Sequence, residues 1–153
     1  MRTLRSLALT ALLLATPAAF ADGFLKAKPK ADDLLPVDQA FALQGASVDG
    51  KDISLKWAIA PGYYLYSHMM KFSVDAPAGA TLGPVKLPKG ESKHDEDFGD
   101  VITFRGPLEA RFPLAKGAAV PRTLRVRYQG CADIGVCYPP QTKLVVVAAS
   151  AAH

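Results

Sequence analysis

Apolar and polar residues alternate with a period of two along most of the chain. In the segment DISLKWAIA, which starts at Asp52, the side chains of Ile53, Leu55 and Trp57 would share one face of an extended strand. Such alternation is typical of a half-buried β-strand, because successive side chains point to opposite faces. The same pattern predicts further strands at residues 40–48, 63–74, 101–104, 108–114, 123–129 and 143–149.

Turn-forming residues separate these predicted strands, as at Pro61-Gly62 and Lys116-Gly117. No stretch of the sequence has the pattern of an amphipathic helix of ten residues. Seven or so short strands at this spacing predict an all-β fold, an immunoglobulin-like β-sandwich. We expect residues 37–148 to form this domain, residues 22–36 to be an irregular N-terminal arm, and residues 149–153 to be a frayed tail.

The first 21 residues have the layout of a secretory signal peptide. Arg2 and Arg5 make the start positive, an apolar run follows, and small residues flank Phe20 as at a cleavage site. Cleavage is therefore expected before Asp22, and it would export the protein. Removing 21 of the 153 residues leaves 132, and the loss of two arginines lowers the formal charge from +4 to +2.

The remaining lysines and arginines are scattered singly, so the sequence does not indicate a nucleic-acid surface. No later segment is apolar over the length that a membrane-spanning helix needs.

The candidate chemistry lies in the segment YQGCADIGVCYPP, which holds both cysteines, Cys131 and Cys137. In an exported chain two cysteines are expected to pair.

Cys131 is expected to end one strand and Cys137 to lie at or near the start of the next. Opposite positions in an antiparallel pair are close enough for a disulfide. A purely structural staple is one interpretation. A ring of seven residues, however, would contribute only about 2 kcal/mol, against about 4.7 kcal/mol for a ring of a hundred.

A metal site is the second interpretation, since soft sulfur ligands suit Cu(I) and Met69 and Met70 follow His68. Against it, five residues between the cysteines is an uncommon zinc spacing.

Thiol–disulfide exchange is the third interpretation. No Lys, Arg or His lies between Tyr128 and Thr142, so nothing local lowers a thiol pKa, and the pair suits attack by a partner's activated thiolate.

The segment YQGCADIGVCYPPQTK resembles the active-site hairpin of the N-terminal periplasmic domain of the thiol:disulfide interchange protein DsbD. LLPVDQAFAL resembles the opening of that domain, LKWAIAPGYYLYSHMMKF its Trp and Gly-Tyr-Tyr-Leu-Tyr strands, and HDEDFGDVITFRG its acidic cap loop. The resemblance runs in the same order from about residue 34 to residue 147. It implies an immunoglobulin-like domain that shuttles electrons in the bacterial periplasm, without a cofactor or metal.

The resemblance also implies partners. A thioredoxin-like donor domain or a membrane electron carrier would reduce the disulfide, and periplasmic disulfide isomerases or cytochrome c maturation thioredoxins would accept the electrons. The family's full protein continues into a transmembrane and a thioredoxin-like domain, whereas this sequence stops at His153. We therefore expect a stand-alone chain, one component of a protein-disulfide reductase system, that is reduced by a separate polypeptide or else serves a different pathway.

By position in the family's motif, Cys137 forms the mixed disulfide with partners and Cys131 resolves it. The resemblance places the cap and the surroundings of the pair at Tyr64, Tyr66, Asp95, Glu96, Asp97, Phe98, Gly99 and Tyr138. The family usually has two aromatic residues before the cap glycine, and here Asp97 takes the first of these positions. Either Phe98 shields the pair from a shifted loop, or the pair is less protected here, and we predict that Phe98 shields it.

Two other functions stay open at this point. One is a non-catalytic immunoglobulin-like binding module with a structural hairpin disulfide. The other is a copper-responsive envelope protein that uses His68, Met69, Met70 or the thiols.

Overall fold

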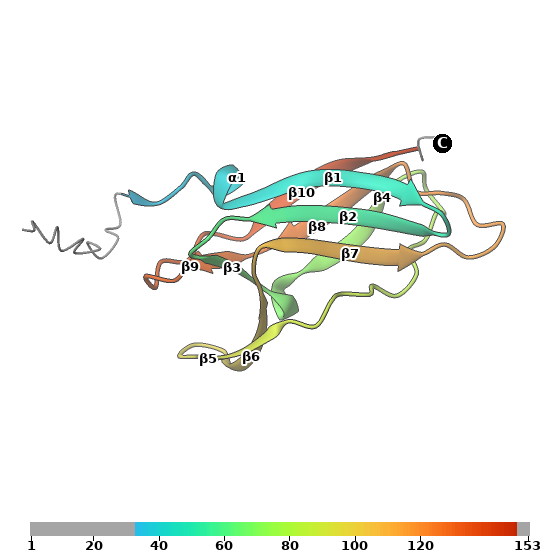
Figure 1. Ribbon diagram of the computed structural model, residues 1–153. Coiled ribbons are helices and arrows are strands. Elements are labelled where there is room, and N and C mark those ends of the chain that lie inside the picture. Colours follow the sequence, from blue (N-terminus) through green and yellow to red (C-terminus); the bar gives the residue numbers. More distant parts are fainter. Residues whose placement is uncertain (1–32, 150–153) are drawn as a thin grey trace, which may run out of the picture.

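Two β-sheets pack against each other in the computed structural model, which describes residues 33–149 (Figure 1). The predicted signal peptide, most of the predicted arm and residues 150–153 lie outside the described residues. The strands are β1 (Phe41–Asp49), β2 (Asp52–Ile59), β3 (Tyr63–Tyr66), β4 (Lys71–Ala76), β5 (Glu91–Asp95), β6 (Gly99–Phe104), β7 (Pro107–Pro113), β8 (Thr123–Tyr128), β9 (Gly130–Ala132) and β10 (Gln141–Ala148).

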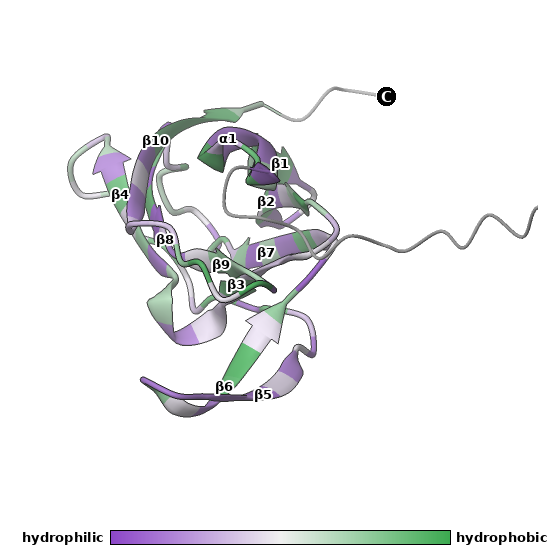
Figure 2. Ribbon diagram, turned by 90° about the vertical axis from the view of Figure 1, so that its left-hand side faces the viewer, coloured by the Kyte–Doolittle hydropathy of each residue, from purple (hydrophilic) through white to green (hydrophobic). Residues whose placement is uncertain are grey.

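A six-stranded sheet has the order β4-β8-β10-β1-β2-β7, and a four-stranded sheet has the order β5-β6-β3-β9. Strand β1 runs parallel to β10, while the other strand pairs of the described residues are antiparallel. Figure 2 shows the β5–β6 hairpin standing away from the six-stranded sheet, beyond β3 and β9. The architecture is the expected immunoglobulin-like β-sandwich, and within the described residues no helix is long and apolar enough to cross a membrane.

The core between the sheets follows the alternation of the sequence. On β2, Leu55 is fully buried, and Trp57 packs edge-on against Phe72 and Tyr128, with ring centroids 6.3 and 6.0 Å apart. Such aromatic pairs add to the stabilisation from buried apolar area. Two short helical pieces lie among the described strands: α1 (Val37–Ala40), which follows Pro36, and the 3-10 turn η2 (Ser67–Met69).

The strand predicted over residues 63–74 is wrong as a single element. The chain forms β3, turns through η2, and then joins the other sheet as β4, beside β8. All four residues of β3 are buried: Tyr63 and Leu65 face the main core, whereas Tyr64 and Tyr66 belong to a second cluster. A strand that is covered on both faces shows no alternation that could reveal where it ends.

The other predicted strands are confirmed to within two residues at each end. Two strands were not predicted. Strand β5 is mostly polar and exposed, with only Asp95 buried, and β9 has only three residues. Together β5 and β6 form a hairpin, Glu91–Phe104, that we call the cap.

Candidate functional site

The two cysteines form a disulfide that closes a short loop at one end of the sandwich. Cys131 lies in β9 and Cys137 pairs with it as an isolated antiparallel bridge, with Cα atoms 3.9 Å apart. The N–H of Ala132 donates to the carbonyl of Val136 at 2.8 Å, and the N–H of Tyr138 donates to that of Gly130 at 3.0 Å. Backbone hydrogen bonds therefore hold the loop on both sides of the disulfide. We call residues 132–136 the cysteine loop.

Gly130 lets this hairpin approach β3 closely. It lies opposite Leu65 in the β3–β9 register, and Cys131 lies opposite Tyr64. A Cβ atom at Gly130 would lie 2.3 Å from the carbonyl oxygen of Tyr64 and 2.7 Å from the ring of Phe41. Only glycine fits at this distance without a shift of the backbone.

The two cysteines differ in their access to solvent. Cys131 has no exposed surface, while Cys137 is exposed. Thiol–disulfide exchange requires that a foreign thiolate reach one of the sulfur atoms. Cys137 is therefore the more accessible of the two residues.

Cys131 is buried in the second cluster, together with Tyr64, Tyr66 and Val101, and with Met69 packed against it. The hydroxyl oxygen of Tyr66 lies 3.5 Å from the Cys131 sulfur, and the Tyr64 hydroxyl lies 3.5 Å from that of Tyr66. The two tyrosine rings pack edge to face at 5.3 Å. Both predicted tyrosines thus lie beside the buried sulfur.

Asp95 connects this cluster to the turn of the cap. Its carboxylate accepts a hydrogen bond of 2.6 Å from the Tyr66 hydroxyl, and further bonds of 3.1 and 3.2 Å from the N–H groups of Asp97 and Phe98. The ammonium group of Lys93 lies 3.8 Å away. The Tyr66 bond, the two N–H groups and Lys93 hold the pKa of Asp95 below its ordinary value, against the opposing effect of burial.

The pKa of Tyr66 is shifted in the opposite direction. Burial is the largest effect, followed by the hydrogen bond to the Asp95 carboxylate, and both raise the pKa of the phenol. Tyr66 is therefore a neutral hydroxyl group beside Cys131 at physiological pH.

The cap turn carries the other predicted residues. Glu96, Asp97 and Phe98 are exposed, and Gly99 ends the turn with a φ of 71°, in the left-handed region that favours glycine. The Phe98 ring packs against Tyr66 at 5.5 Å and against His68 at 5.0 Å, and it stays 44% exposed. Its role as a shield of the cysteine pair stays a prediction.

The side chain of Tyr138 lies elsewhere, against the main core. Its ring packs edge-on against Phe41 at 5.3 Å, and its hydroxyl donates a 2.6 Å hydrogen bond to the carbonyl of Leu35. The N–H of Leu35 donates in turn to the Tyr63 hydroxyl at 2.8 Å. Tyr138 thus connects the hairpin to the end of the N-terminal arm, and its side chain is not part of the cluster around Cys131.

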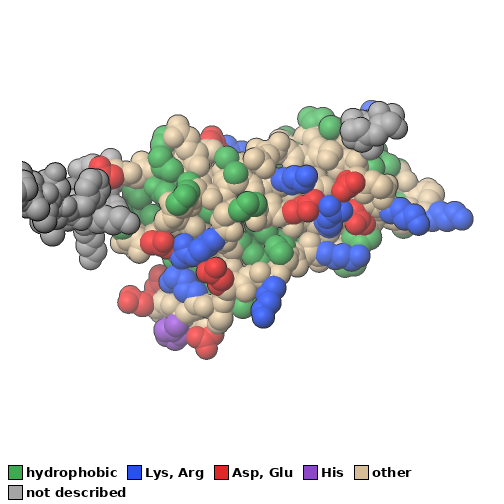
Figure 3. All heavy atoms as spheres, in the orientation of Figure 1, with side chains coloured by type: hydrophobic (Ala, Val, Ile, Leu, Met, Phe, Trp, Pro, Cys, Tyr) green, Lys and Arg blue, Asp and Glu red, His purple; other side chains and the backbone are tan. Residues whose placement is uncertain are grey.

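Sequence reasoning missed a set of charged residues around the cysteine loop. Arg105, directly after β6, binds both carboxylate oxygens of Asp133 in the loop, at 2.7 and 3.1 Å. The guanidinium of Arg105 and the ammonium of Lys93 lie 5.1 and 5.2 Å from the centre of the Tyr64 ring. Figure 3 shows charged groups of both signs gathered over the cap. No spacing in the sequence connects Arg105 with Asp133, which is 28 residues away.

The methionines proposed for copper do not converge. Met70 is buried in the main core, whereas Met69 packs in the second cluster. Residues 33–149 contain no group of three His, Cys, Asp or Glu side chains placed to hold a metal ion. The described part of the chain therefore holds no assembled set of His, Cys, Asp or Glu ligands for the copper interpretation.

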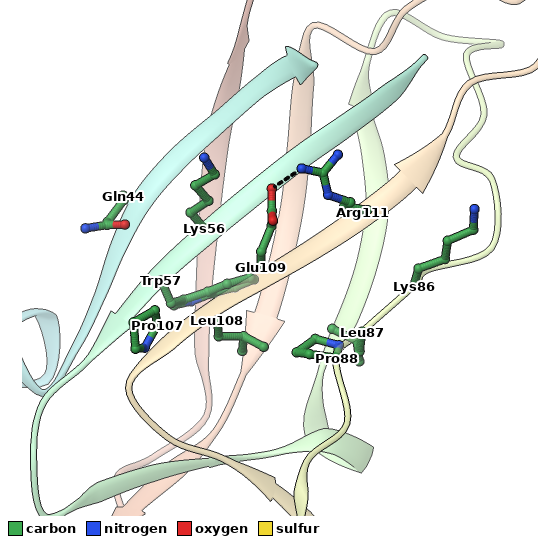
Figure 4. A pocket seen from close by; sticks show the side chains of 10 residues that line it. All are labelled: Gln44, Lys56, Trp57, Lys86, Leu87, Pro88, Pro107, Leu108, Glu109 and Arg111. Carbon is green, nitrogen blue, oxygen red and sulfur yellow. Dashed lines mark ion pairs between the residues drawn. The ribbon is translucent and has the colours of Figure 1, made fainter. Parts of the chain in front are cut away.

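A surface hollow of about 540 Å³ lies away from the disulfide (Figure 4). It is lined by residues of β1, β2 and β7 and by the segment 86–88, and Glu109 and Arg111, both on β7, form an ion pair at 2.9 Å on one side of it. None of the predicted site residues lines it. Exchange between protein thiols needs an accessible sulfur rather than an enclosed pocket, so this hollow does not compete with the disulfide as the candidate site.

Comparisons with known proteins point to one family. The family described as "Thiol:disulfide interchange protein DsbD, N-terminal" matches residues 31–149. The chain is 42% identical over 147 residues to DsbD 1 of Pseudomonas aeruginosa, covering 91% of this chain and 24% of that protein. It is 47% identical over 111 residues to DsbD of Pectobacterium atrosepticum, covering 72% and 18%. The chain thus spans about a quarter or less of the length of these relatives.

Solved structures give the same result. The crystal structure of the Neisseria meningitidis DsbD N-terminal domain in the reduced form aligns with a TM-score of 0.66 and 35% identity, covering 78% of this chain and 94% of that one. A structure of the complex between the DsbD and PilB N-terminal domains of the same organism aligns with a TM-score of 0.64 and 36% identity, covering 74% and 87%.

Proposed function

Since the chain belongs to the family of DsbD N-terminal domains, we propose that it carries electrons by thiol–disulfide exchange through Cys131 and Cys137. The difference in burial between the two cysteines is the observation that carries this proposal. A foreign thiolate reaches the exposed Cys137, whereas Cys131 is shielded by Tyr64, Tyr66 and Val101. Cys137 is therefore the exchanging residue and Cys131 the resolving one.

Electrons enter when a donor thiolate attacks the sulfur of Cys137. The Cys131–Cys137 bond breaks, Cys131 leaves and takes up a proton, and a mixed disulfide joins Cys137 to the donor. The second thiol of the donor then attacks the donor's first sulfur in that mixed disulfide. The donor leaves with a disulfide of its own, and both cysteines of this chain are reduced.

Electrons leave by the reverse sequence. The thiolate of Cys137 attacks a partner's disulfide and forms a mixed disulfide, and one partner sulfur leaves as a thiol. Cys131 then loses its proton and attacks Cys137, which releases the partner fully reduced. Burial keeps the Cys131 sulfur away from other thiols until a mixed disulfide on Cys137 brings its target within reach.

The partners we propose are thioredoxin-like proteins in the periplasm. A donor domain or a membrane electron carrier would reduce the chain, and a disulfide isomerase or a cytochrome c maturation thioredoxin would accept its electrons. The complex of a similar Neisseria meningitidis domain with the PilB N-terminal domain supports a thioredoxin-like partner. Periplasmic location after removal of a signal peptide follows the family and is part of the proposal.

Trapping with single-cysteine variants tests the proposal. Each variant is incubated with an oxidised thioredoxin-like protein and separated on non-reducing gels. Cys131→Ala should accumulate a mixed disulfide through Cys137, because the resolving thiol is missing. Cys137→Ala should accumulate little, because its remaining thiol is buried. Equal trapping by both variants would contradict the assigned roles, and no trapping by either would favour a binding module with a structural disulfide.

A further inference from the structure

We infer that Arg105 is a positioning residue for the exchange reaction, acting through Asp133 on the cysteine loop. The inference rests on the proposed function. Arg105 holds the loop so that Cys137 stays opposite Cys131 after the disulfide has been broken. The two sulfurs then remain within reach of each other, which sets how readily the bond re-forms.

The contact between the two side chains is a two-point clamp. One guanidinium nitrogen, Nη2, donates to Oδ1 of Asp133 at 2.7 Å, and the other, Nη1, donates to Oδ2 at 3.1 Å. Bidentate pairs of this kind fix orientation as well as distance, which a single ion pair does not. The side chain of Arg105 is 34% exposed and that of Asp133 49%, so solvent screens the charges in part and the two-point geometry is the main contribution of the pair.

Further contacts anchor Arg105 to the rest of the site. Nη1 also donates to the carbonyl of Tyr63 at 3.3 Å, and Nε lies 3.4 Å from the carboxylate of Glu91. The guanidinium also packs over the ring of Tyr64, whose backbone lies opposite Cys131. Arg105 thus connects three elements: the cysteine loop, strand β3 beneath it, and strand β5 of the cap.

Asp133 is held from two directions. Its N–H donates to the carbonyl of Gly62 at 2.8 Å, while its carboxylate is held by Arg105. In the oxidised protein the disulfide also closes the loop covalently. After reduction that covalent link is gone, so the position of Cys137 depends on such non-covalent contacts. The Arg105–Asp133 clamp therefore has its largest effect on the position of Cys137 when both cysteines are reduced.

The step that depends on this geometry is the resolution of a mixed disulfide. Cys131, as a thiolate, attacks the sulfur of Cys137; the Cys131–Cys137 bond forms, the bond to the partner breaks, and the partner leaves as a thiolate. The rate and the equilibrium of such an intramolecular step increase when the reacting groups are held in place. Loosening the loop should therefore weaken the internal disulfide relative to mixed disulfides.

Glutathione redox buffers test this inference without a protein partner. The variants are Arg105→Gln, Arg105→Lys and Asp133→Asn, with Arg111→Gln as the matched control, because Arg111 also pairs with carboxylates but lines the distant hollow on β7. For each we would measure the equilibrium constant of the internal disulfide, the fraction of protein carrying glutathione on Cys137, and the urea midpoint.

Arg105→Gln is expected to lower the equilibrium constant about tenfold, which corresponds to a potential less negative by about 30 mV. The glutathione-bound fraction should rise in proportion. Arg105→Lys should behave like Arg105→Gln, since a lysine keeps the charge but cannot bind both oxygens. Asp133→Asn should lower the equilibrium constant by the same factor, and combining Arg105→Gln with Asp133→Asn should not lower it further. The equilibrium constant of Arg111→Gln should stay within twofold of the wild-type value.

Two results would overturn the inference. One is an equilibrium constant within twofold of the wild type in Arg105→Gln, or in Asp133→Asn if the arginine variant does not fold. The other is a wild-type equilibrium constant in Arg105→Lys, which would show that the charge of the side chain alone is responsible. Failure of the proposed function would look different: the wild-type disulfide would resist thioredoxin-like proteins, while the comparison of variants in glutathione would still be readable.

Discussion

Replacing Tyr66 with phenylalanine removes one oxygen atom from the cluster beneath the cap and leaves the ring in place. That oxygen donates a 2.6 Å hydrogen bond to the carboxylate of Asp95, which is only 9% exposed. The same carboxylate holds the cap turn through the N–H groups of Asp97 and Phe98. The substitution therefore tests how strongly Asp95 fastens the cap to the cysteine site.

The expected loss of stability follows from these contacts. A hydrogen bond to a charged group contributes about 1.5 to 3 kcal/mol. Asp95 keeps two N–H donors and Lys93 after the change, so the carboxylate is not left without partners. We therefore expect Tyr66→Phe to lower the free energy of unfolding by about 2 kcal/mol at pH 7, a large share of the roughly 5 to 15 kcal/mol of an ordinary domain.

The effect should depend on pH in a defined direction. The Tyr66 hydroxyl is the largest of the causes that lower the pKa of Asp95 in the folded protein. A carboxylate with a lowered pKa contributes stability above its unfolded-state pKa of about 3.9, and that contribution is lost as the pH falls through the folded-state pKa. The difference between wild type and Tyr66→Phe should therefore shrink by at least half in acid.

Urea unfolding of both proteins at pH 7, and at the lowest pH at which both still fold, measures this difference. Tyr64→Phe is the matched control, because within residues 33–149 the Tyr64 hydroxyl has one hydrogen-bond partner, the Tyr66 hydroxyl at 3.5 Å. It should cost less than about 1 kcal/mol at either pH. A loss below about 0.5 kcal/mol for Tyr66→Phe at pH 7, or an equal loss at both pH values, would refute the role given to Asp95.

Three further changes have defined outcomes. Phe98→Ala should speed the alkylation of the reduced cysteines severalfold. Ile102→Ala is the control, since Ile102 is also 44% exposed, and it should leave the rate unchanged. An unchanged rate for Phe98→Ala would show that Phe98 does not shield the pair. Gly130→Ala should lower the free energy of unfolding by about 3 kcal/mol in urea, since its Cβ would lie 2.3 Å from the Tyr64 carbonyl, and a loss below about 1 kcal/mol would contradict that contact. Tyr138→Phe should cost about 1 kcal/mol through the bond to the arm, and no measurable loss would show that the arm is not held there.

The alternation of the sequence predicted the sandwich because most strands have one buried and one exposed face. Strand β2 is the clearest case, with Leu55 and Trp57 inward and Lys56 outward. The pattern failed at β3, where Tyr63 faces the main core and Tyr64 faces the cluster beneath the cap. Periodicity cannot locate the end of such a strand, so the turn at η2 and the crossing to the other sheet were not foreseen.

The candidate site was predicted in part, and mainly from the resemblance to the family. The motif gave the cysteines and the residues of the cap, but only the fold shows that Cys131 is buried and Cys137 exposed. Arg105 and Asp133 could not be connected from the sequence, because each is an isolated charge there and the pair forms only when β6 and the cysteine loop meet. The resemblance grouped Tyr138 with the surroundings of the pair, whereas its side chain packs against the main core.

The reduction potential of the Cys131–Cys137 bond tests the proposed function most directly. The protein without residues 1–21 would be equilibrated in graded thiol buffers, and its alkylated cysteines counted by mass. A carrier should have a potential of roughly −180 to −270 mV, the range of known exchange proteins. A value below about −300 mV would mark a bond that the common redox pools do not open, and the disulfide would then be a structural staple of a binding module.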